Sequence, residues 1–216
     1  MDCSSEYKVF TEADWNEVSP AVLEKKKDDS EPFHIYMGSK TLAERAAWKF
    51  VDEEKPSFSV STICPPYVLG PIVQQVSGPD AINTSVSSFY PIAKGDIQEK
   101  DLPGPLGNYV DVREVADAHA KALVTPKAGG ERYIVSAGPF SKADLTKSLN
   151  KAVPSLKLPE AKADVAEEAY KKAQVFSGKK ATEQLGIQYR SIDETVKDMY
   201  ESIKAKGFVG GNENKL

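Results

Sequence analysis

Two side chains with complementary ionisation lie four residues apart, Tyr36 and Lys40. Residues at this spacing are neighbours on one face of a helix. An ammonium group beside a phenol favours the phenolate and makes the tyrosine a usable general acid and base. The spacing alone is weak evidence, because 9 tyrosines and 28 lysines plus arginines in 216 residues give about one such pair by chance. The alternative is a tyrosine at a helix start and a solvated lysine.

The neighbouring sequence predicts a helix that carries this pair. Four apolar side chains recur at the spacing of one helical face, Tyr36 and Lys40 belong to the same stripe, and Pro56 ends the pattern. Residues 58–64 are rich in β-formers and are followed by two prolines, which predicts a strand. The four apolar residues are Ala43, Ala46, Ala47 and Phe50.

The later sequence continues as alternating helices and strands. Asp111 is placed as the N-cap of a helix with apolar positions from 112 to 123. Residues 132–136 form a second predicted strand. Ser141 and Ser191 each open a further helix through a capping box. This rhythm is typical of an α/β protein, although two strands are few for a sheet that helices must cover.

The composition limits which kinds of partner and which cellular compartment we expect for this protein. The formal net charge of −4 argues against nucleic acid as a partner, because phosphate binding needs a basic surface. No apolar run approaches the ~20 residues that span a bilayer. Two cysteines and two histidines support neither a disulfide framework nor a metal site. The chain start lacks the features of a signal peptide, so we expect a cytoplasmic protein with no membrane partner.

Four sequence blocks, in order along the chain, resemble the extended short-chain dehydrogenase/reductase family. The first is Tyr-x-x-Ser-Lys-x-x-x-Glu at 36–44, which small residues follow. The second is the strand end Cys-Pro-Pro-Tyr-Val-Leu-Gly-Pro at 64–71, and the third is Asn-Tyr-Val-Asp-Val-Arg-Glu-Val-Ala at 108–116. The last combines Leu-Gly at 185–186 with Ser-Ile-Asp-Glu-Thr at 191–195. The ordered set is far more specific than any one block.

Residues 11–16, Thr-Glu-Ala-Asp-Trp-Asn, are similar to a segment of the fungal and plant aldehyde or ketone reductases, the methylglyoxal-reductase and dihydroflavonol-reductase group. The resemblance implies an α/β fold with an incomplete Rossmann-like doubly wound parallel sheet, its N-terminal strands missing, plus a small α/β substrate-binding lobe. Residues 1–70 would be the remainder of the Rossmann-like domain with the active-site helix. In the mixed segment 71–216, the substrate lobe, the returning Rossmann elements and the C-terminal helix would occupy about 71–108 with 137–190, about 109–136, and 191–206.

The resemblance also implies roles for individual residues. Tyr36 would protonate the developing alkoxide while a dihydronicotinamide supplies the hydride, and Lys40 would hydrogen-bond the nicotinamide ribose. Ser5, in a Cys-Ser-Ser stretch, would polarise the substrate carbonyl, and a frayed chain start is the alternative. The implied cofactor is NADPH, with NADH as the alternative, and the implied partner is a small-molecule carbonyl substrate. Four residues would lie along the nicotinamide: Pro65, Pro66, Tyr67 and Val68.

The glycine-rich strand–turn–helix segment with which this family binds the dinucleotide pyrophosphate does not occur in the sequence. We therefore expect weak NADPH binding, and unpaired strand edges through which the chain could self-associate. Two other interpretations stay open. One is a truncated, non-enzymatic relic or interaction module. The other is a sugar-nucleotide epimerase or dehydratase that reuses the Tyr36/Lys40 pair, although residues 11–16 favour the reductases.

Several other side chains are expected to be structural. His119 follows the apolar stripe of its helix and is predicted to be a buried core histidine. His34 lies close to the tyrosine and could face the site, but an ordinary loop histidine is the favoured interpretation. Cys64 is predicted to be a small buried residue at a strand end. Trp15 and Trp48 are predicted to serve packing.

Overall fold

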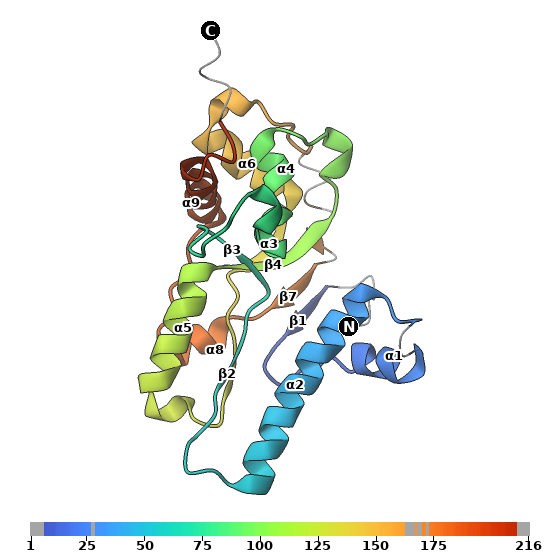
Figure 1. The fold of residues 1–216 in the computed structure, drawn as a ribbon, viewed down its shortest axis with the longest axis vertical. Helices are drawn as coiled ribbons and strands as arrows, with labels where there is room; N and C mark the ends of the chain where they lie inside the picture. Colours follow the sequence, from blue (N-terminus) through green and yellow to red (C-terminus); the bar gives the residue numbers. More distant parts are fainter. Residues whose placement is uncertain (1–6, 27–28, 163–166, 168–169, 172, 211–216) are drawn as a thin grey trace.

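Strands and helices alternate along the chain in the computed structural model, which describes residues 7–26, 29–162, 167, 170–171 and 173–210 (Figure 1). This confirms the predicted α/β class. The strands are β1 (Lys8–Phe10), β2 (Thr62–Cys64), β3 (Tyr67–Leu69), β4 (Pro105–Asp111), β5 (Arg132–Ile134), β6 (Gly138–Ser141) and β7 (Gln174–Phe176). The helices are α1 (Val18–Lys26), α2 (Pro32–Glu54), α3 (Thr84–Ser87), α4 (Tyr90–Lys94), α5 (Val112–Val124), α6 (Lys142–Ala152), α8 (Lys179–Leu185) and α9 (Ile192–Ala205).

The strands of the described residues form three small sheets, with the orders β1–β7, β2–β5 and β3–β4–β6. Every pairing is parallel except β4 with β6. The predicted strands 58–64 and 132–136 correspond to β2 and β5, which pair only over three residues each, from Thr62 opposite Arg132 to Cys64 opposite Ile134. Parallel pairing places the carboxyl ends of β2 and β5 at the same edge.

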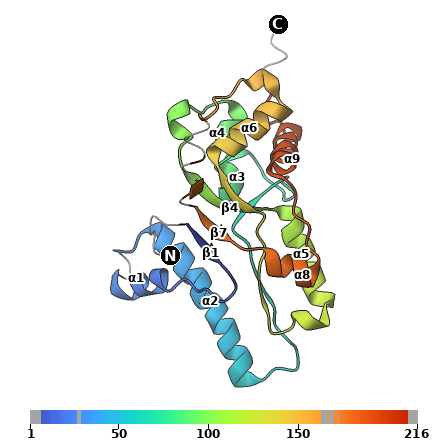
Figure 2. The same ribbon diagram turned by 180° about the vertical axis from the view of Figure 1, so that it is seen from behind.

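Two hydrophobic cores hold these sheets. The first lies beneath α3, α4, α6 and α9, which gather at one end of the molecule around the β3–β4–β6 sheet (Figures 1 and 2). The second is smaller and joins α5 and α8 to β4 and β5. Its fully buried members are Val110, Ala118, Ala128, Tyr133, Val135 and Ala181.

Helix α2 packs against α1 at the other end of the molecule (Figure 1). Gly38 permits this packing, because a Cβ there would meet the side chain of Leu23. Gly38 and Thr41 are the buried residues of α2. The apolar stripe found in the sequence instead faces solvent at Ala43, Ala46 and Phe50, and only Ala47 of that stripe is half-buried.

Helix caps follow the sequence closely. Asp111 is an N-cap, as predicted, and also forms a reciprocal capping box with Glu114, while Ser141 and Asp144 form the predicted capping box. Ser191 accepts from the Glu194 backbone nitrogen at 3.2 Å, but the Glu194 carboxylate pairs with Arg190 rather than returning to the cap. The prediction that His119 is buried is wrong. Helix α5 buries Glu114 and Ala118 instead, which leaves the imidazole exposed. None of the helices in the described part of the chain is long and apolar enough to cross a membrane.

Candidate active site

Tyr36 and Lys40 lie one turn apart on α2, as their spacing predicts. Pro32 occupies the first turn of this helix, where its missing N–H is not needed. The Lys40 Nζ lies 5.5 Å from the centroid of the Tyr36 ring, close enough for a cation–π contact. Tyr36 is 61% exposed. The pair is therefore preformed by local helix geometry and is open to an incoming molecule.

Glu44 fixes the part of α2 that follows this pair. Its carboxylate accepts hydrogen bonds from Arg132 Nε at 2.7 Å, from Thr62 Oγ1 at 2.7 Å and from the indole of Trp48 at 3.2 Å. Burial alone would raise the pKa of Glu44, but these hydrogen bonds and the charge of Arg132 outweigh burial and hold that pKa below its usual value. Glu44 thus ties α2 to both β2 and β5.

Arg132 extends this anchor to the segment 11–16. Its guanidinium lies 3.8 Å from the Trp15 ring centroid and donates to the carbonyl oxygens of Glu12 and Asp14. Glu12 in turn accepts from the backbone nitrogen of Ile134 at 2.9 Å. The segment that resembles a reductase signature therefore braces α2 against β5. The sequence predicted packing for Trp15 but gave no sign of its arginine partner.

The predicted nicotinamide segment begins where β2 ends. Pro65 and Tyr67 are exposed, whereas Pro66 and Val68 are half-buried. The Tyr67 ring stands edge to face on Phe140, with 5.9 Å between ring centroids. The segment leaves β2 and joins β4 in a different sheet, because Val68 pairs with Val110 there. Its position at the carboxyl end of a parallel strand is where open α/β sheets bind ligands.

Cys64 closes β2 beside the anchor. Its thiol lies 3.8 Å from a Glu44 carboxylate oxygen. Burial raises the pKa of this thiol, and the negative charge of Glu44 raises it further. A thiol in this setting stays protonated, so Cys64 is a half-buried strand-end residue without nucleophilic character.

Asp111 and Glu114 form a second buried charged cluster at the start of α5. Asp111 accepts from the Arg113 backbone nitrogen at 2.9 Å and from its guanidinium at 2.7 Å. Burial opposes ionisation of Asp111, yet the bonds from Arg113 lower its pKa below the usual value. Glu114 pairs with Arg190. Arg113 also pairs with Asp198 of α9 at 2.7 Å, so these caps and ion pairs hold α5 and α9 together.

The structure describes only one of the two remaining candidate residues, His34 and Ser5. His34 lies in α2 rather than in a loop, and its ring faces the hydroxyl of Ser19 at 3.2 Å. Ser5, the predicted carbonyl-polarising residue, lies outside the described residues. No group of histidine, cysteine, aspartate or glutamate within the described ranges could hold a metal ion.

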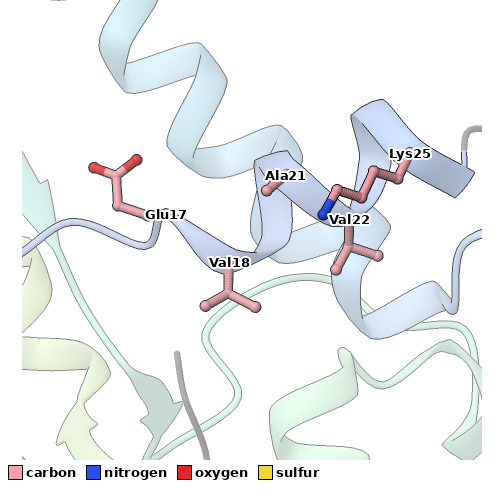
Figure 3. Close-up of a pocket in the computed structure, with 5 residues that line it drawn as sticks. All are labelled: Glu17, Val18, Ala21, Val22 and Lys25. Carbon is pink, nitrogen blue, oxygen red and sulfur yellow. The ribbon is translucent and has the colours of Figure 1, made fainter.

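Two hollows in the surface of the described residues lie away from the Tyr36/Lys40 pair. One of about 370 Å³ lies on α1 and is lined by Glu17, Val18, Ala21, Val22 and Lys25 (Figure 3). A shallow one of about 550 Å³ lies far along the chain at Gln98–Lys100 and Pro103. Tyr36 stands on an open helix surface, because its side chain is 61% exposed.

The fold and the site together define a class. No protein-family model matches the sequence. Gre2 from Candida albicans, solved in complex with NADPH, superposes with a TM-score of 0.78 at 30% identity, over 91% of this chain and 57% of that chain. Together with the sequence relatives described next, this likeness relates the chain to the short-chain dehydrogenase/reductase enzymes and shows a Rossmann-like fold.

Two of the sequence relatives are fungal oxidoreductases. The NADPH-dependent methylglyoxal reductase of Saccharomyces cerevisiae is 33% identical over 198 residues, which are 90% of this chain and 56% of the relative. An uncharacterized oxidoreductase of Schizosaccharomyces pombe is 40% identical over 148 residues, 68% of this chain and 42% of the relative. The chain spans about half the length of the curated relatives it matches.

Proposed function

We propose that this chain is the part of an NADPH-dependent carbonyl reductase that carries the proton-donating tyrosine. The observation that carries the proposal is the Tyr36/Lys40 pair on α2, with a 5.5 Å separation between ammonium and ring centroid. The names of the relatives, a methylglyoxal reductase among them, support an aldehyde or ketone as substrate. An epimerase or dehydratase remains the weaker alternative, because its structural likeness is at 20% identity.

The proposed chemistry is the reduction of a carbonyl to an alcohol. A dihydronicotinamide, when bound, supplies the hydride to the carbonyl carbon. Tyr36 donates its phenolic proton to the alkoxide oxygen that develops, and Lys40 favours the phenolate that remains. Ser5 would polarise the carbonyl. The four residues proposed to lie along the nicotinamide are Pro65, Pro66, Tyr67 and Val68.

The described residues suit only the nicotinamide end of the dinucleotide. A pyrophosphate cradle needs glycines between a strand and a helix N-terminus. Gly178 precedes α8, but a Cβ there would meet the backbone oxygen of Ser136 and the Tyr189 hydroxyl, so this glycine serves protein packing. We therefore expect this chain alone to bind NADPH more weakly than micromolar, with NADH no better.

The proposed division of the chain separates the residues for nucleotide binding from those for substrate binding. Residues 1–70 carry the remainder of the nucleotide-binding domain with α2. The substrate lobe takes residues of about 71–108 and 137–190, and about 109–136 return to the nucleotide-binding domain before the final helix at 191–206. We also infer a reducing, cytoplasmic location from the two cysteines, which are too few for a disulfide framework.

The test measures aldehyde-dependent oxidation of NADPH at saturating, millimolar cofactor, because weak binding is expected, with methylglyoxal as the first substrate. Tyr36→Phe keeps the ring and removes the proton, and is expected to abolish turnover. Tyr90→Phe is the matched control, because the Tyr90 hydroxyl donates to the carbonyl oxygen of Phe208 at the first hydrophobic core, beneath α4, α6 and α9. Turnover that survives Tyr36→Phe would contradict the proposed role.

A further inference from the structure

Helix α1 carries an apolar stripe on the side that it turns away from α2. Ser19 and Leu23 lie on its inner side, where they contact α2. On the outer side, Val18 and Val22 are half-buried and Ala21 is exposed. These three residues line the hollow of about 370 Å³, and every residue that lines it belongs to the segment 17–25 (Figure 3). The hollow is therefore one open side of a single helix.

A carboxylate and an ammonium group stand at opposite ends of this stripe. Glu17 lies one residue before the start of α1, and Lys25 lies in the last turn. The Glu17 side chain is 70% exposed, and one of its carboxylate oxygens accepts a hydrogen bond from Arg45 of α2. Within the described residues, no ion pair involves Lys25. The stripe therefore has a negative charge at one end and a positive charge at the other.

This order of charges is self-complementary about Ala21, which lies four residues from both Glu17 and Lys25. If two identical helices pack antiparallel about a two-fold axis at Ala21, Glu17 of each copy lies opposite Lys25 of the other. The macrodipoles of the two helices then run in opposite directions, which is also favourable. Parallel packing would instead bring like charges together at both ends.

We propose that the outer side of α1 binds the same surface of a second copy of this chain, with the two helices antiparallel. We call this surface the α1 face, and it is formed by Glu17, Val18, Ala21, Val22 and Lys25. The valines of both copies would pack around the two small Ala21 side chains, and two Glu17–Lys25 ion pairs would flank them. Helix α1 lies at the outer edge of the molecule in both views, where a second copy has access to it (Figures 1 and 2). This inference is independent of the proposed reductase function.

The α1 face is small, so we expect a weak dimer. Helix α1 has 9 residues, and a helix of this length extends about 14 Å. Two such helices bury less than the roughly 1,200–2,000 Å² of a standard stable interface, which predicts a dissociation constant of about 10–100 µM. Charge pairs at the rim of such a contact mainly decide which orientation and which partner are selected.

The experiment measures the association of the full 216-residue chain by sedimentation equilibrium. The protein concentration runs from about 5 to about 500 µM, which brackets the expected dissociation constant. Lys25→Glu places two carboxylates opposite each other at both ends of the contact, and it is expected to weaken the dimer about tenfold or more. Lys26→Glu is the matched control. It makes the same charge change on α1 but lies outside the α1 face, and the dissociation constant should stay within about twofold.

A mixture of two variants gives the sharpest test. Lys25→Glu carries acidic residues at both ends of the α1 face, and Glu17→Lys carries basic residues at both ends. Each variant alone should be largely monomeric, whereas a 1:1 mixture regains both ion pairs in a heterodimer. We expect the mixture to associate within about threefold of the unaltered chain, since Glu17→Lys also gives up the contact with Arg45. Circular dichroism checks that both variants keep their helices.

Each outcome decides the proposal. A dimer that Lys25→Glu disperses, and that the mixture with Glu17→Lys restores, supports antiparallel packing on the α1 face. A chain that is monomeric at every concentration would overturn it. So would a dimer that Lys26→Glu weakens as much as Lys25→Glu does, or one that neither variant affects, because association would then use another surface. A mixture that stays monomeric would refute the proposed opposition of Glu17 and Lys25.

Discussion

Glu44 and Arg132 form a bidentate ion pair between α2 and β5, although they are 88 residues apart in the sequence. Arg132 Nε lies 2.7 Å from one carboxylate oxygen of Glu44, and Arg132 Nη2 lies 3.1 Å from the other. The side chain of Arg132 is only 17% exposed and that of Glu44 only 15%. Paired geometry and partial burial make this contact stronger than an ordinary surface ion pair. It links α2 to β5.

Removing the charge of Glu44 should destabilise the chain. Glu44→Gln leaves Arg132 partly buried without its counter-ion, and we expect a loss of about 2 kcal/mol in the free energy of unfolding, less than for a fully buried pair. Urea unfolding followed by circular dichroism measures it. Glu53→Gln is the control, since its pair with Lys49 is exposed at 3.6 Å, and it should change stability by less than about 0.5 kcal/mol. Equal effects would contradict the assigned role.

The same carboxylate should make stability depend on pH. The pKa of Glu44 is lower in the folded chain than its usual value of 4.5. An acid of this kind stabilises the fold fully above its unfolded pKa, and the contribution is lost as the pH falls through the folded pKa. Between about pH 6 and pH 3 the unaltered chain should therefore lose more stability than Glu44→Gln does. Parallel thermal melts of both proteins at the two pH values test this expectation.

Two glycines in left-handed conformations offer a matched test of packing. A Cβ at Gly70, where φ is +109°, would lie 2.9 Å from the buried Asp111 carboxylate. At Gly95 φ is +81°, and a Cβ would meet nothing within 4 Å. Gly95→Ala should cost about 1 kcal/mol from backbone strain alone, and Gly70→Ala about 3 kcal/mol because overpacking is added. Denaturant midpoints for the two variants give the difference, and similar values would show that the Asp111 site can yield.

The Cys64 thiol should react slowly, because burial and Glu44 raise its pKa. In a Cys3→Ser background, where Cys64 is the remaining cysteine, alkylation by iodoacetamide at about pH 8 should be several-fold slower than that of a free thiol. Adding Glu44→Gln removes the negative charge, keeps Arg132, and should speed the reaction. Mass spectrometry over time reports both rates. A rate unchanged by Glu44→Gln would mean that access alone limits the thiol.

Contacts between residues close in the sequence made several features of this protein predictable. The caps at Asp111 and Ser141 were predictable because a cap involves residues three apart, and Tyr36 and Lys40 meet because one helical turn brings them together. The α/β class and the reductase resemblance also followed from sequence. The two predicted strands were found, though only three residues of each are paired.

Tertiary structure decided what periodicity cannot. An apolar stripe predicts which side of a helix is apolar, but it does not predict which neighbouring element packs there. Phe50 and His119 lie on such stripes and are nevertheless exposed. The Glu44–Arg132–Trp15 anchor joins residues that no local pattern relates, because an ion pair and a stacked ring depend on where β5 and the segment 11–16 finally lie. Local helix geometry, which is readable from the sequence, thus brings Tyr36 and Lys40 together, whereas tertiary packing determined that Tyr36 is exposed.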